Sequence, residues 1–123
     1  MRSIAILGAS PQRSKFGNKA VRAYLAGGWQ VLPVNPAGAA IEGQPSFKSL
    51  ADLPVTPDRL SVYLPPPVTL ALLPAMLASG ASQVFFNPGS ADDAVHRRAR
   101  ELGLPFVDAC SIVDIGFSPS QFP

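Results

Sequence analysis

The chain has 123 residues, 47% hydrophobic and 15% charged, which is the composition of a single globular domain rather than a disordered segment. A net charge of +2 is too small to predict a nucleic-acid-binding surface, and no apolar run approaches the roughly 20 residues of a membrane span. The only cysteine, Cys110, excludes an internal disulfide. We therefore expect one cytoplasmic domain over residues 1–123, with neither nucleic acid nor a membrane as partner; a homodimer is left open.

The first structural signal is a strand–loop–helix junction near the N-terminus. The apolar run Ile4–Leu7 predicts a strand, because it leads directly into a turn of small residues at Gly8. A polar loop follows, and we expect a helix that Asn18 caps and that reaches about Ala26. In doubly wound α/β proteins this junction binds nucleotide phosphates, because helix N-terminal N–H groups and the helix dipole attract anions.

Positive charge gathers at the same junction. Residues 1–41 contain no Asp or Glu, and most of their cations lie between Arg13 and Arg22. The pattern is compatible with a solvated basic helix face or with a positive field around a polyphosphate. The position of the cations beside the Gly8 turn favours the second interpretation.

The rest of the chain alternates between strand and helix patterns. Further strands are expected at Trp29–Val34, Arg59–Tyr63, Ser82–Phe86 and Pro105–Asp108. Helices are expected at Val68–Ser79, which is apolar on nearly all sides and predicted to be well buried, and from the Ser90 cap to Gly103. Residues 37–57 look irregular, and residues 109–123 form a tail that either packs or stays mobile.

This element order predicts a Rossmann-like, doubly wound α/β fold. The five strands would form a parallel sheet between two helical layers, in the order 3-2-1-4-5 that right-handed crossovers favour. A ligand would then bind beyond the C-terminal strand ends, between the first and fourth strands.

The usual nucleotide signatures are incomplete. The dinucleotide fingerprint G-x-G-x-x-G would have glycine where this chain has Ser10 and Arg13, and Gly17 comes too late to replace either one. The second strand ends at Asn35 rather than at the acidic residue that holds a ribose. NAD is therefore disfavoured, NADP less so, and no Walker-type loop is present.

Several short motifs together carry a more specific signal. In chain order they are Gly8-Ala9-Ser10, Lys15-Phe16-Gly17, Pro33-Val34-Asn35-Pro36 with Gly43 beyond, and Asn87-Pro88-Gly89. From Ile4 to about Val113 the chain resembles the standalone CoA-binding proteins, small Rossmann-like domains similar to the CoA-binding domain of succinyl-CoA synthetase α-type subunits. The resemblance implies coenzyme A as ligand, with acyl-CoA left open.

The resemblance also implies a role for each motif. Gly8, Ala9 and Ser10 would cradle the pyrophosphate, Lys15 would neutralise it, and Phe16 and Gly17 would shape the loop. Asn35 and Pro36 would border the adenosine, and Leu64, Pro65 and Pro66 would line the wall next to the ring or ribose. Asn87, Pro88 and Gly89 would face the pyrophosphate or the pantetheine arm.

Catalytic groups are few in this sequence. His96 reads as a surface helix residue and Cys110 as a small buried one, while Ser10 has no evident base partner and no residues have metal-ligand spacing. A non-catalytic or accessory CoA-binding module is therefore favoured over an enzyme. The alternatives are an NAD(P)-binding oxidoreductase or sensor, and an interaction protein with a vestigial pocket.

Overall fold

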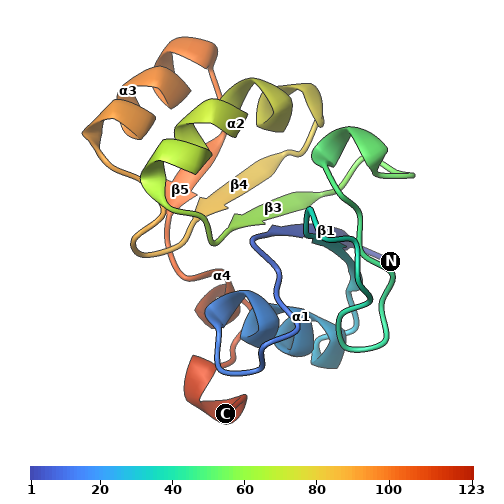
Figure 1. The fold of residues 1–123 in the computed structure, drawn as a ribbon. Coiled ribbons are helices and arrows are strands. Elements are labelled where there is room, and N and C mark those ends of the chain that lie inside the picture. The colour runs from blue at the N-terminus through green and yellow to red at the C-terminus, as the bar shows by residue number, and fades with distance from the viewer.

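The computed structural model describes residues 1–123 as a parallel sheet between helices (Figure 1). Its strands are β1 (Ser3–Leu7), β2 (Gln30–Val34), β3 (Arg59–Val62), β4 (Gln83–Phe86) and β5 (Phe106–Asp108). Its helices are α1 (Phe16–Ala26), α2 (Pro66–Ala78), α3 (Asp93–Leu102) and the short α4 (Ser111–Asp114), with 3-10 turns η1 (Leu50–Asp52) and η2 (Pro119–Gln121). The predicted Rossmann-like α/β fold is confirmed.

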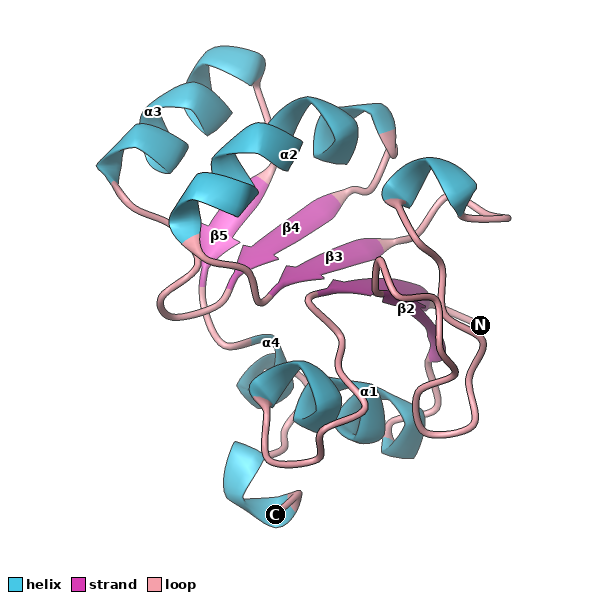
Figure 2. Cartoon of the chain, viewed as in Figure 1, coloured by secondary structure: helices cyan, strands magenta, loops and turns pink.

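Two hydrophobic cores lie on opposite faces of the sheet. Successive strand side chains point to opposite faces, so Ala5 and Leu7 pack with α2 and α3, whereas Ile4 and Ile6 pack with α1 and α4. Figure 2 shows the two helical layers that these faces carry. Because both faces are covered, the strands read in the sequence as continuous apolar runs.

The strand order differs from the predicted one in the place of a single strand. The sheet runs β2-β1-β3-β4-β5, so β3 lies between β1 and β4 instead of at the edge beyond β2. The connection from β2 to β3 carries Leu50 into the core under α2, on the face opposite α1. A right-handed crossover on that face takes the chain back past β1. Residues 35–58 contain no α-helix, so the sequence offered little to decide which face they cover.

The burial of α2 also differs from the prediction. Only Thr69, Leu73 and Met76 of this helix are buried, whereas Val68 and Leu77 are 43% and 42% exposed. The helix is apolar all round, but it covers the sheet on one side only and no further layer packs against its outer side. None of the helices is long and apolar enough to cross a membrane.

The C-terminal segment packs against the α1 side of the sheet. Ile112 is fully buried, and Phe117 and Phe122 pack against the same core. Arg22 of α1 donates hydrogen bonds to the carbonyl oxygens of Phe122 and Pro123 at 3.0 and 3.1 Å. The tail is thus part of the fold.

Candidate functional site

A cavity of about 750 Å³ opens at the C-terminal ends of β1, β2 and β3. The chain leaves β1 toward β2 on one face and then reaches β3, on the other side of β1, across the opposite face. In open α/β sheets, ligands bind at the crevice where the winding direction reverses. Here that crevice lies between β1 and β3, not between β1 and β4 as predicted, because β3 occupies the inner position.

Most of the predicted site residues meet at this cavity. Its lining includes every one of them except Pro66 and Asn87. Pro66 is the first residue of α2, and Asn87 is 2% exposed beneath the cavity wall. The residues that also line the cavity and were not predicted are Ser14, Val34, Tyr63 and Ser90. Ser14 and Ser90 are direct sequence neighbours of the motif residues Lys15 and Gly89. That adjacency is the signal from which they could have been predicted as cavity residues.

Two glycines allow the phosphate-type loop to pack closely. Gly8 has a φ of +83°, and a Cβ there would overlap the carbonyl oxygen of Tyr63. A Cβ on Gly17 would overlap the carbonyl oxygen of Gly8. Gly17 therefore supplies the close helix packing that the third glycine supplies in the dinucleotide fingerprint. The expectation that Gly17 comes too late in the sequence was wrong, because the loop between Gly8 and Gly17 is longer than the loop of the dinucleotide fingerprint.

Amide side chains hold this loop in place. Asn18 donates to the carbonyl oxygen of Ser10 at 2.9 Å and to Glu42 at 3.1 Å, and it accepts a hydrogen bond from Arg22. Asn35 donates to the carbonyl oxygen of Ala9 at 2.9 Å. Asn18 is thus a fully buried loop anchor rather than the predicted helix cap, and α1 begins two residues earlier, at Phe16.

The loop presents hydrogen-bond donors that the protein itself does not use. The backbone N–H groups of Ala9, Ser10, Phe16 and Gly17 have no acceptor within the chain, although Ala9, Ser10 and Gly17 are buried. Buried N–H groups are nearly always paired, so those of Ala9, Ser10 and Gly17 call for an acceptor from outside the chain, whereas Phe16 is exposed. Two of them also stand at the N-terminus of α1, where the helix dipole favours an anion.

The cations of the loop differ in their availability. Lys15 is exposed at the cap position of α1, lines the cavity and forms no ion pair with any carboxylate. Arg13 lies 3.7 Å from Glu42, which partly neutralises it. Lys15 is therefore the cation best placed to meet a negatively charged ligand.

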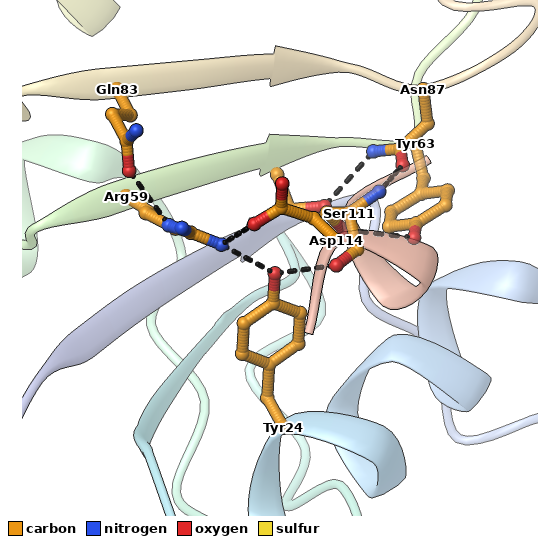
Figure 3. Close-up of polar contacts among 8 residues, drawn as sticks. Tyr24, Arg59, Tyr63, Gln83, Asn87, Ser111 and Asp114 are labelled. Atoms are coloured by element: carbon orange, nitrogen blue, oxygen red, sulfur yellow. Dashed lines mark hydrogen bonds and ion pairs between the residues drawn. The ribbon is translucent and has the colours of Figure 1, made fainter. Parts of the chain in front are cut away.

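A buried polar network lies beneath the cavity (Figure 3). Asn87 donates to the Ser61 hydroxyl and to the Val62 carbonyl, both at 2.9 Å, and its own oxygen accepts from the backbone N–H of Ser111. The Ser111 hydroxyl in turn lies 3.3 Å from the Tyr63 hydroxyl. Asn87 therefore joins β3 and β4 to α4, which explains why it does not face the cavity.

The same network contains a buried cation. Arg59 is 6% exposed and donates to Asp114 at 2.6 Å, to Gln83 at 2.8 Å and to the Tyr24 hydroxyl at 3.3 Å. Its guanidinium also lies 4.9 Å from the ring centre of Trp29. These contacts fix α4 to the sheet.

The network predicts an unusual alkaline titration. Burial raises the pKa of Tyr63 to about 12 and also raises the pKa of Tyr24, and these are the only tyrosines. The unfolded chain loses both protons near its ordinary pKa of about 10, so the stability present below that pH is lost as pH rises toward 12. In an alkaline titration, tyrosinate absorbance should therefore appear at a higher pH in the folded protein than in the protein unfolded by urea. The Tyr63→Phe variant should lose stability less steeply over this range, and an equal slope would contradict the assignment.

Two residues singled out in the sequence lie outside this cavity. Cys110 is partly buried and packs against the core on the α1 side. His96 lies on α3 at the surface, as expected for a helix residue, but its side chain is only 22% exposed and its Nε2 lies 2.8 Å from Asp108 Oδ1. The partner Asp108 stands at the end of β5, and no local pattern places that strand end beside His96.

Comparison with known proteins agrees with the ordered motifs. A family model described as a CoA binding domain matches residues 2–116. A conserved hypothetical protein from Pyrococcus furiosus is 31% identical, with a TM-score of 0.84 and coverage of 93% of this chain and 99% of that one. A protein from Thermus thermophilus is 33% identical, with a TM-score of 0.84 and coverage of 92% and 87%.

A larger protein shares the fold. The dinucleotide-forming acetyl-coenzyme A synthetase 1 of Ca. Korarchaeum cryptofilum, in complex with phosphate and ADP, is 22% identical with a TM-score of 0.76. The match covers 87% of this chain but 25% of the synthetase, and at this identity it shows a common fold alone. The family match over nearly the whole length is decisive: the chain belongs to the CoA-binding domain family.

Proposed function

We propose that this protein binds coenzyme A, with the pyrophosphate held by the loop from Gly8 to Gly17. The observation that carries the proposal is the set of unpaired, mostly buried N–H groups at Ala9, Ser10, Phe16 and Gly17. Together with the α1 N-terminus and unpaired Lys15, they supply the hydrogen bonds and positive potential that a pyrophosphate requires. Membership of the CoA-binding domain family supports this ligand over other polyphosphates.

The strand order suggests how the ligand lies. Asn35 and Pro36 follow β2, on one side of the phosphate loop, and we assign the adenosine to them. Leu64 and Pro65 follow β3, on the other side of the loop, so we assign them to the start of the pantetheine arm rather than to the ring. A cavity of about 750 Å³ is within the range of small-molecule sites.

We further propose that the protein acts as an accessory cytoplasmic module that binds its ligand without converting it. The groups that line the site are mainly backbone amides, small residues and prolines, which suit recognition. The cavity lining contains no His, Asp or Glu that could act as a base toward Ser10, whose Oγ accepts a hydrogen bond from the backbone N–H of Gln12.

Thermal unfolding with a panel of ligands tests the proposal. A ligand present at 100 times its Kd should stabilise the folded state by about 2.7 kcal/mol. We expect a rise in Tm with CoA and none with NAD. A rise with NAD or NADP alone would instead support an oxidoreductase or sensor, and no response to any of them would support an interaction protein.

Lys15→Ala is expected to weaken CoA binding about tenfold at low salt, because it removes an unpaired cation from the cavity wall. The loss should shrink at high salt, where the interaction is screened. Calorimetric titration at two salt concentrations measures both effects. Arg97→Ala is the control, since it makes the same change in net charge on the exposed side of α3. Equal CoA affinities for the two variants would show that Lys15 does not contact the ligand.

A further inference from the structure

A second, smaller cavity of about 260 Å³ lies at the C-terminal ends of β4 and β5. Its lining residues are Phe86, Asn87, Pro88, Gly89, Ala91, Asp108 and Ala109. Pro88 and Gly89 also line the first cavity, so the two cavities share one wall. Gly89 has no side chain, and the space that its Cβ would occupy is open, so no side chain separates the two cavities at this residue.

One charged group faces this second cavity. Asp108 ends β5, its side chain is 56% exposed, and its Oδ1 lies 2.8 Å from His96 Nε2. The His96 ring stacks on Phe106 at a centroid distance of 5.7 Å and an interplanar angle of 22°. The imidazole is therefore fixed from one side, and it orients the carboxylate. Asp108 Oδ2 has no hydrogen-bond partner in the protein.

The order of the strand ends connects the two cavities along one line. With the adenosine beyond β2 and the pyrophosphate beyond β1, the arm passes the end of β3 and then the end of β4. Pro88 and Gly89 stand at the end of β4, and the next strand end in the row is Asp108 of β5. An extended ligand that follows this row thus ends in the second cavity.

We propose that the second cavity receives the thiol end of the pantetheine arm. The Asp108 carboxylate accepts a hydrogen bond from the thiol, and His96 is a positioning residue that orients this carboxylate. The inference rests on the proposed function. A free thiol can donate one hydrogen bond, whereas a thioester sulfur has no hydrogen to donate. The site therefore selects free CoA over acyl-CoA. A carboxylate beside the sulfur also disfavours the thiolate, which suits a module that binds CoA without activating it.

Three ligands separate the arm from the rest of the molecule: CoA, desulfo-CoA, in which hydrogen replaces the thiol, and adenosine 3′,5′-bisphosphate, which lacks the arm. In calorimetric titrations the wild type should bind CoA about fivefold more tightly than desulfo-CoA, as expected for one hydrogen bond to a charged acceptor. Asp108→Ala should bring that ratio close to one and leave the bisphosphate affinity unchanged. Asp93→Ala, another acid-to-alanine change at the start of α3, should preserve the ratio.

Two further variants complete the test. His96→Leu should lower the ratio only in part, because the carboxylate stays but is no longer held. Ala109→Leu fills the second cavity alone and should weaken CoA about fivefold without affecting the bisphosphate. A wild-type ratio that persists in Asp108→Ala would overturn the subsite while CoA binding itself stands. A wild type that binds no CoA would overturn the proposed function as well.

Discussion

Replacing Gly17 with alanine is expected to destabilise the protein by about 3 kcal/mol and to abolish CoA binding. The added Cβ would overlap the carbonyl oxygen and carbon of Gly8, and both belong to backbone that neighbouring contacts hold in place. Gly17 has no positive φ, so the whole effect comes from this overlap. The overlap can be relieved only if α1 and the loop move apart. Because these two elements carry the unpaired N–H groups, this movement would also disrupt the phosphate site.

Gly27→Ala is the matched control for this prediction. Gly27 stands just beyond the other end of α1, where a Cβ would meet side-chain atoms of Ile115 and Trp29 at an ordinary 3.4 Å. Its free energy of unfolding should stay within about 0.5 kcal/mol of the wild type. Urea unfolding of both variants measures the difference. A Gly17→Ala protein as stable as Gly27→Ala would show that the loop and the helix do not pack as described.

Asn87→Ala is expected to lower the free energy of unfolding by about 3 kcal/mol while leaving the affinity for adenosine 3′,5′-bisphosphate, which lacks the arm, nearly unchanged. Asn87 is 2% exposed and makes three hydrogen bonds, so its loss leaves Ser61, the Val62 carbonyl and the Ser111 N–H without this partner. Each buried group left unpaired costs about 1 kcal/mol or more. Affinity is measured well below the Tm, so that the variant is still folded.

Asn35→Ala should show the opposite pattern. Asn35 lines the first cavity and donates one hydrogen bond to the Ala9 carbonyl, so we expect a stability loss of about 1 kcal/mol and a clear loss of affinity. Urea unfolding and calorimetric titration of both variants separate the two roles. If Asn87→Ala were instead stable and weak in binding the bisphosphate, Asn87 would contact the ligand in the first cavity, as the resemblance had implied.

The sequence predicted those parts of the protein that depend on local signals. A run of apolar residues into Gly8 marks β1 and its loop, and the acid-first, base-last pattern with Gly103 marks α3. The ligand loops were implied by a resemblance that rests on short motifs of glycine, proline and asparagine after the first, second and fourth strands. The resemblance based on these motifs was enough to identify most of the cavity lining.

What the sequence could not predict depends on distant contacts. The place of β3 depends on which face residues 35–58 cover, and Leu50 gives no local sign of that choice. Asn18 looked like a helix cap because a cap and a buried loop anchor need the same side-chain amide or oxygen. His96 and Asp108 meet only because α3 packs beside β5, so neither position indicated the pair.

In the proposed complex, the loop from Gly8 to Gly17 binds the phosphates of CoA through its unpaired N–H groups. Backbone amide chemical shifts in a nuclear magnetic resonance titration test it most directly, because a new hydrogen bond to phosphate moves the amide proton strongly downfield. On addition of CoA the largest downfield shifts should fall on Ala9, Ser10, Phe16 and Gly17, should saturate, and should not appear with NAD. Saturable CoA binding that leaves the chemical shifts of these four amides unchanged would contradict this mode of phosphate binding.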